Sequence, residues 1–94
     1  MIKPDPITKR VVLVTGPSGA GRSSAIKVLE DLGFEAIDNM PLRLIPALLD
    51  DPVAGKSMAL GIDPRTRDFS LAAVIDALGL IGRNSYFTPE LLYL

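Results

Sequence analysis

The chain has 94 residues, 48% of them hydrophobic, and its 10 lysines and arginines nearly balance 11 aspartates and glutamates, for a net charge of −1. These values predict at most one small folded domain, argue against disorder, and leave no basic field that would attract a nucleic acid. Cysteine and histidine are absent, so we expect no disulfide and no metal site built on those ligands. No apolar run approaches a length of about 20 residues, which a membrane helix needs, so we expect no membrane span.

The first half of the chain alternates strand and helix patterns. After a lead-in of residues 1–9 that we expect to be flexible, the β-branched run Val11–Thr15 predicts a buried strand. A helix is predicted from about Arg22 to Leu32, and Phe34–Ile37 predicts a short second strand. The apolar face of the helix is expected at residues spaced i, i+3, i+4 and i+7: Ala25, Val28, Leu29 and Leu32.

The second half repeats the alternation. Leu42–Leu49 predicts two short helical pieces, and a polar hinge at residues 50–56 separates them from a third predicted strand, Met58–Ile62. A second long helix is predicted to begin at Asp68 or Ser70 and to end near Leu78, and Leu91–Leu94 indicates a fourth strand. The apolar face of this helix is expected at the same spacing: Leu71, Val74, Ile75 and Leu78.

Alternating strands and helices predict an α/β fold, with right-handed crossovers and a parallel sheet covered on both faces. Ligands of such sheets bind at the carboxyl ends of the strands. Three polar segments follow predicted strands and should therefore meet at this edge: Gly16–Ser23, Asp38-Asn39 and Asp63–Arg67.

The segment after the first strand fits the phosphate-binding pattern G-x-x-x-x-G-K-[ST], except that Arg22 stands in place of lysine. Its backbone N–H groups and the N-terminus of the following helix would bind phosphate oxygens, and the hydroxyl of Ser23 would bind Mg²⁺. The alternatives are an ordinary loop, an Arg22 that faces solvent, and a Ser23 that only caps the helix. The candidate nucleotide site consists of Gly16, Pro17, Ser18, Gly19, Ala20, Gly21, Arg22 and Ser23.

Five blocks of sequence are together more specific than the phosphate loop alone: Thr15–Ser23, Leu29–Phe34, Asp38–Pro41, Gly61–Asp68 and Phe87–Leu94. With these blocks in this order, the chain resembles the RapZ/YvcJ family of P-loop nucleotide-binding proteins, bacterial proteins that include an adapter delivering a small RNA to an endoribonuclease. The resemblance implies that residues 10–94 form the N-terminal part of a P-loop NTPase-type domain, truncated, with the family's C-terminal domain absent.

The resemblance also implies sites for two nucleotides, ATP with Mg²⁺ at Gly16–Ser23 and GTP at the family's Asp-x-Arg-x motif after the third strand. In this chain the second motif consists of Asp63, Pro64, Arg65 and Thr66. The chain departs from the family pattern at Arg22, where lysine is usual, and at Met40, where leucine is common. Family members also continue past the position of Leu94 to an acidic residue, so we expect weak hydrolysis from the full-length protein and little from this chain.

Other polar side chains have both a functional and a structural interpretation. Asp38 either positions a water or a metal ion, or closes an Asx turn with Asn39. The charges of Asp63–Arg67 either bind the second nucleotide or form a solvated loop. The aromatic residues near the last strand are expected to pack in the core: Tyr86, Phe87 and Tyr93.

The leading hypothesis is therefore a cytoplasmic, ATP- and GTP-binding regulatory protein of the RapZ/YvcJ type. In its full-length form it would be a homo-oligomeric RNase adapter that binds RNA through the missing C-terminal domain. One alternative is a P-loop small-molecule kinase in which Asp38 would accept the proton of the substrate hydroxyl. Another is a partner-binding module whose loop no longer binds nucleotide. No catalytic residue is identified.

Overall fold

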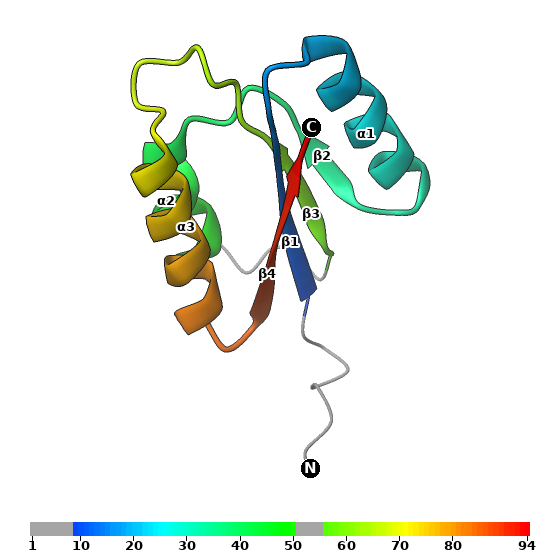
Figure 1. Cartoon of the computed structure of the whole chain (residues 1–94). Helices are drawn as coiled ribbons and strands as arrows, with labels where there is room; N and C mark the ends of the chain where they lie inside the picture. The colour runs from blue at the N-terminus through cyan, green and yellow to red at the C-terminus, as the bar shows by residue number, and fades with distance from the viewer. Residues whose placement is uncertain (1–8, 51–55) are drawn as a thin grey trace.

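The structure, a computed structural model, describes residues 9–50 and 56–94. Residues 1–8 of the expected lead-in and 51–55 of the expected hinge therefore lie outside the described residues. Four parallel strands form one sheet in the order β2-β3-β1-β4, namely β1 (Lys9–Thr15), β2 (Glu35–Ile37), β3 (Met58–Gly61) and β4 (Phe87–Tyr93) (Figure 1).

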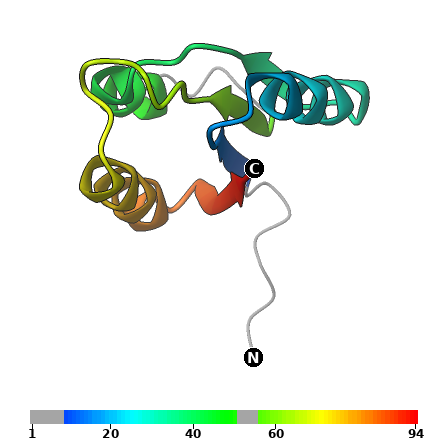
Figure 2. The same cartoon turned by 45° about the horizontal axis from the view of Figure 1, so that its top comes forward.

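Helices cover both faces of this sheet, which confirms the predicted α/β architecture. The helix α1 (Gly19–Asp31) lies on one face, and the other carries a 3₁₀ turn, η1 (Leu42–Leu44), with α2 (Ile45–Asp50) and α3 (Leu71–Arg83) (Figure 2). The turn η1 followed by α2 also confirms the two helical pieces predicted between the second and third strands.

The central strand β1 supplies side chains to both layers of the core. Val11 and Leu13 belong to the larger apolar cluster, which includes Ile45 and Ile81 from the helices α2 and α3. Val12 and Val14 pack on the other face, against Ile26 of α1. Burial on both faces explains the unbroken apolar run from which this strand is predicted.

The helix α1 begins earlier than predicted and buries a different face. It starts at Gly19 because Ser18 caps it, the side-chain oxygen accepting the backbone N–H of Gly21 at 2.9 Å. The predicted apolar face is wrong at two of its four positions, since Val28 is 57% exposed and Leu32 is 69% exposed. The residues turned toward the sheet have the same spacing three positions earlier: Arg22, Ala25, Ile26 and Leu29.

The inward face of the helix α3 is also displaced by three residues, here toward the C-terminus. Leu71 and Ile75, both predicted to be buried, are 67% and 65% exposed. The helix also continues through Gly79 and Gly82 to Arg83, beyond the predicted end. Its inward face consists of Val74, Ala77, Leu78 and Ile81. A largely apolar helix satisfies the helical spacing on more than one face, so packing on the sheet decides which face is buried.

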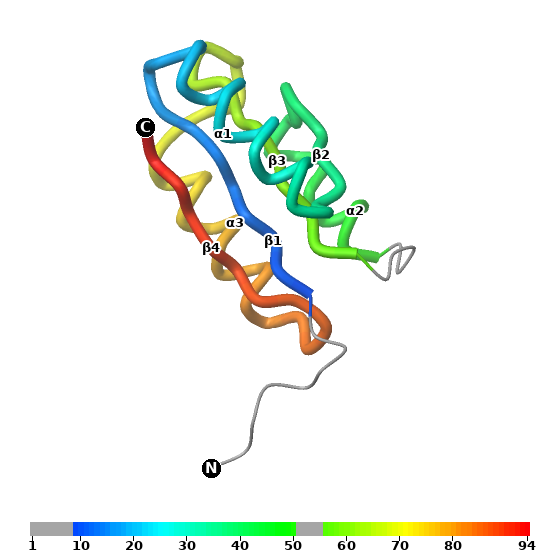
Figure 3. The backbone as a smooth tube through the Cα atoms, turned by 90° about the vertical axis from the view of Figure 1, so that its right-hand side faces the viewer, coloured from blue at the N-terminus to red at the C-terminus, as the bar shows by residue number. Residues whose placement is uncertain are grey.

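The strand β4 lies at the edge of the sheet, beside β1 (Figure 3). The packing prediction is confirmed for Phe87, which is 8% exposed, but it is wrong for Tyr86 and Tyr93, which are 60% and 62% exposed. Tyr86 lies in the turn before β4, and Tyr93 ends an edge strand, which has a sheet neighbour on one side only. Within the described ranges no helix is long and apolar enough to cross a membrane.

Candidate functional site

The carboxyl edge of the sheet brings together the three polar segments predicted to meet there. The end of β1 is joined to Ile62, the residue after β3, by two hydrogen bonds, from the Ile62 N–H to the Val14 carbonyl at 2.8 Å and from the Thr15 hydroxyl to the Ile62 carbonyl at 2.7 Å. The segment after β2 joins β3 through the Met40 N–H, which donates to the Gly61 carbonyl at 2.8 Å. The ends of β2, β3 and β1 are thereby held side by side.

The loop that begins at Gly16 depends on two glycines. Gly16 has a φ of +128° and lies against the backbone of Leu94, so any side chain there would be strained and would collide with the Leu94 carbonyl. A Cβ atom on Gly21 would lie 2.9 Å from the Ser18 hydroxyl oxygen that caps α1. Between them, Pro17, Ser18 and Gly19 are exposed to solvent. The loop therefore presents its backbone, and the N-terminus of a 13-residue helix, to the surroundings.

Arg22 is the charged residue that this helix buries. Its side chain is only 9% exposed, which excludes the alternative of a solvent-facing arginine. The guanidinium lies between two carboxylates, with Nε 3.7 Å from Asp38 Oδ1 and Nη2 3.9 Å from Asp63 Oδ2. The Nε–H is buried without a hydrogen-bond acceptor, which is uncommon for a polar group in a native protein.

Asp38 is held in place by its own segment and by the strand beside it. Its Oδ1 accepts the backbone N–H of Asn39 at 2.8 Å, and Asn39 has a φ of +53°. A Cβ on Gly61 would collide with this same Oδ1 and with the end of the Ile26 side chain. Gly61 is not among the predicted site residues, although a glycine within a strand pattern indicates a close approach of neighbouring atoms.

Asp63 organises the loop that follows β3. Its Oδ1 accepts the backbone N–H of Arg65 at 2.9 Å, and its carbonyl accepts the Thr66 hydroxyl at 2.9 Å. The backbone N–H and then the side chain of Arg65 hold the pKa of the Asp63 carboxyl below its ordinary value. The Arg65 side chain is 87% exposed, with Nη2 3.3 Å from Asp63 Oδ2. The motif Asp63–Thr66 is thus a tight turn with an accessible guanidinium.

Ser23 is exposed within the first turns of α1. The alternative in which it caps the helix is wrong, because Ser18 holds that position. Among residues 9–50 and 56–94, no three metal-binding side chains of the His, Cys, Asp or Glu type gather in one place.

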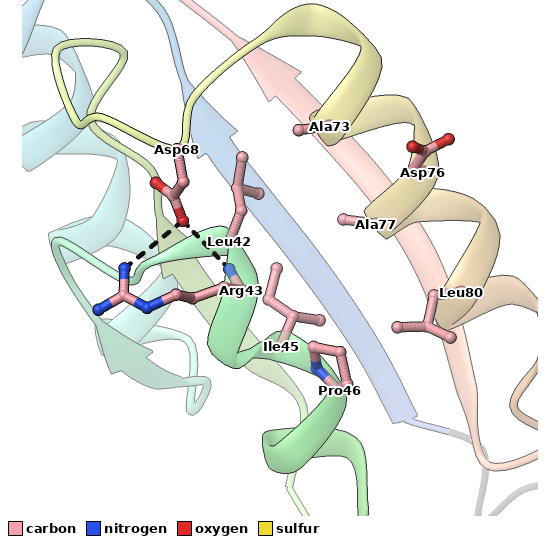
Figure 4. Close-up of a pocket in the computed structure, with 9 residues that line it drawn as sticks. All are labelled: Leu42, Arg43, Ile45, Pro46, Asp68, Ala73, Asp76, Ala77 and Leu80. Atoms are coloured by element: carbon pink, nitrogen blue, oxygen red, sulfur yellow. Dashed lines mark hydrogen bonds and ion pairs between the residues drawn. The ribbon is translucent and has the colours of Figure 1, made fainter.

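A separate pocket of about 290 Å³ lies between η1, α2 and α3, on the face of the sheet opposite α1 (Figure 4). Asp68 Oδ2 accepts the backbone N–H of Arg43 at 3.1 Å at one end of it, which links η1 to the loop after β3. This bond lowers the pKa of the Asp68 carboxyl. No local sequence pattern predicts the pocket, although the small Ala73 and Ala77 on α3 leave room for it. It is lined by Leu42, Arg43, Ile45, Pro46, Asp68, Ala73, Asp76, Ala77 and Leu80.

Comparison with known proteins shows which family the chain resembles. Residues 9–94 match the model of the RapZ-like N-terminal domain. A nucleotide-binding protein of Roseobacter denitrificans is 60% identical over 86 residues, which are 92% of this chain and 29% of the relative. A nucleotide-binding protein of Dinoroseobacter shibae is 56% identical over 91 residues, 97% of this chain and 30% of the relative. The chain therefore spans less than a third of the length of these relatives.

Proposed function

The chain belongs to the family of RapZ-like N-terminal domains, and from this premise we propose that it binds a nucleoside triphosphate at Gly16–Ser23. The names of its relatives, nucleotide-binding proteins of Roseobacter denitrificans and Dinoroseobacter shibae, support the proposal. ATP is the proposed ligand of this loop, with Mg²⁺ carried on its phosphates.

The observation that carries the proposal is the buried guanidinium of Arg22 with its unpartnered Nε–H. It lies at the carboxyl edge of a parallel sheet, where ligands of such folds bind, and near the N-terminus of α1. A phosphate group offers several acceptor oxygens and suits the planar, charged donor set of an arginine. The residue that departs from the lysine pattern therefore remains suited to bind an anion.

Each part of the loop has a role in this proposal. Backbone N–H groups between Gly16 and Gly21 would surround the phosphates, and the positive end of α1 would stabilise their charge. Ser23 would contribute a hydroxyl to Mg²⁺, a cation that prefers oxygen ligands. When bound, the metal ion would neutralise charge on the phosphate oxygens. Asp63 lies after β3, the strand next to β1, and its Oδ2 is 3.9 Å from Arg22 Nη2.

A second nucleotide, GTP in the leading hypothesis, is proposed to contact Asp63, Pro64, Arg65 and Thr66. The exposed guanidinium of Arg65 would bind its phosphate, while the turn closed by Asp63 would fix the loop. The kinase alternative receives less support, because Asp38 Oδ1 already accepts the N–H of Asn39 and faces Arg22.

For a protein of the length of the relatives, we also propose weak nucleotide hydrolysis, RNA binding through a further domain, and oligomerisation. Weak hydrolysis fits the positions of the two nearby carboxylates. Asp38 and Asp63 both face the Arg22 guanidinium, so neither is left to position a water molecule. We accordingly expect slow turnover from residues 1–94.

The experiment is a titration with Mg-ATP and Mg-GTP, followed by isothermal calorimetry and by the rise in melting temperature. Gly21→Val should abolish ATP binding, because its side chain would displace the Ser18 hydroxyl that shapes the loop. Gly79→Val is the matched control, since it places the same side chain in α3, where a Cβ meets only the end of Arg83 at 3.5 Å. Equal nucleotide responses from wild type and Gly21→Val would refute the assignment of the loop.

A further inference from the structure

Two arginines converge on one carboxylate oxygen at the carboxyl edge of the sheet. Arg22 Nη2 lies 3.9 Å from Asp63 Oδ2, and Arg65 Nη2 lies 3.3 Å from the same atom. The distance between the two Nη2 atoms therefore cannot exceed the sum of these two separations. Asp38 Oδ1 lies 3.7 Å from Arg22 Nε, so two guanidinium groups face two carboxylates and the charges of the four side chains balance.

The side chain of Arg65 is loosely held, whereas its backbone is not. The side chain is 87% exposed, and its Nε and Nη2 atoms lie 3.4 and 3.3 Å from the Asp63 carboxylate oxygens, farther than the about 2.9 Å of an ordinary N–H···O bond. An exposed ion pair of this kind contributes little to stability, so a stronger acceptor can replace it at small cost. The backbone N–H of Arg65 donates to Asp63 Oδ1 at 2.9 Å, which holds the loop wherever the side chain points.

We propose that Arg65 binds the terminal phosphate of the nucleotide held by Gly16–Ser23, so that Arg22 and Arg65 act on one triphosphate; the inference rests on the proposed function of the loop. Each charge-assisted N–H···O bond is about 2.8 Å long, and two such bonds to different oxygens of one phosphate group span a distance comparable to the separation of the two guanidinium groups. The two motifs then form one continuous phosphate site. A second nucleotide therefore contacts Asp63–Thr66 only while the loop holds none.

The position of Arg65 beside Arg22 favours the terminal phosphate over the inner ones. In loops of this pattern the backbone N–H groups surround the inner phosphates, and the basic residue after the second fixed glycine reaches the outer ones. In this chain that residue is Arg22, which follows Gly21. Because Arg65 shares a carboxylate oxygen with Arg22, it lies nearest the phosphates that Arg22 reaches. Binding of ATP should therefore depend on Arg65, and binding of ADP should not.

The test compares the affinities for Mg-ATP and Mg-ADP, measured by calorimetry, in the wild type, Arg65→Ala and Arg67→Ala. We expect Arg65→Ala to weaken ATP binding at least about tenfold, the effect of losing hydrogen bonds to a charged group, and to change ADP binding less than about twofold. Arg67→Ala is the matched control, because it removes another exposed arginine from the same loop. Unchanged ATP affinity in Arg65→Ala, an equal loss in Arg67→Ala, or equal losses of ATP and ADP affinity in Arg65→Ala would overturn the inference.

A second measurement counts the nucleotides bound. Equilibrium dialysis against saturating Mg-ATP and Mg-GTP together should give one nucleotide per chain. Two nucleotides per chain would overturn the single phosphate site while leaving ATP binding by the loop intact. Absence of ATP and ADP binding in all three proteins would overturn the proposed function and, with it, the role of Arg65.

Discussion

Replacing Arg22 with methionine should destabilise the protein, because it keeps most of the side-chain length but removes the cation between two carboxylates. Loss of one partner from a fully buried ion pair costs about 3–5 kcal/mol. The cost here should be smaller, because the side chain of Asp38 is 41% exposed and Asp63 is also paired with Arg65. We expect a loss of about 1–2 kcal/mol in the free energy of unfolding, or a decrease of roughly 5–15 °C in melting temperature for a domain of this size.

The assay is urea unfolding followed by circular dichroism, which gives the free energy and its dependence on denaturant. The double variant Arg22→Met/Asp38→Asn is the internal control, because removal of the uncompensated charge should restore at least half of the lost stability. Arg22→Met should also weaken ATP binding by about 1.5–3 kcal/mol, the usual contribution of hydrogen bonds to a charged group. Wild-type stability in Arg22→Met, or no recovery in the double variant, would refute the assignment of Arg22 as a buried, carboxylate-paired cation.

Three further predictions follow from the same contacts. Gly61→Ala should lower the free energy of unfolding by about 1 kcal/mol in urea titrations and weaken ATP binding, because a Cβ there displaces Asp38 Oδ1 and the end of Ile26. Unchanged stability and affinity would contradict the close approach of these two side chains to Gly61. Ser18→Ala should cost about 1 kcal/mol in the same assay through loss of the α1 cap, and a neutral result would argue against that cap. The pKa values of Asp63 and Asp68 in the folded state lie below the ordinary 3.8, so their contribution to stability should be fully present above pH 3.8 and should be lost as the pH falls through the folded-state pKa. Asp68→Asn should flatten this loss in acid-unfolding curves, and an unaltered curve would contradict the shift at Asp68.

The sheet could be predicted from the sequence because its strands carry local signals. Val11–Thr15 and Met58–Gly61 are continuous apolar runs followed by polar loops, and their burial on both faces needs no knowledge of distant residues. The meeting of the loops at one edge followed from the parallel topology. These features depend on periodicity and connection order alone.

The helix faces could not be predicted in the same way. Arg22 was assigned to the phosphate-binding pattern from its place between Gly21 and Ser23, and the apolar spacing did not show that it occupies the first inward position of α1. It is buried there because Asp38 and Asp63, which are remote in sequence, provide the compensating charge. These long-range contacts define the surroundings of the candidate phosphate-binding arginine.

The most direct test of the central claim is an NMR titration of the 94-residue chain with Mg-ATP. We expect the largest chemical-shift changes at the backbone amides of residues 16–23 and at the Nε–H of Arg22, with smaller changes near Asp38 and Asp63. The amides that line the pocket between α2 and α3 should remain unchanged. Saturable changes confined to that pocket, or no changes at residues 16–23 at millimolar Mg-ATP, would contradict the assignment of Gly16–Ser23 as the nucleotide site.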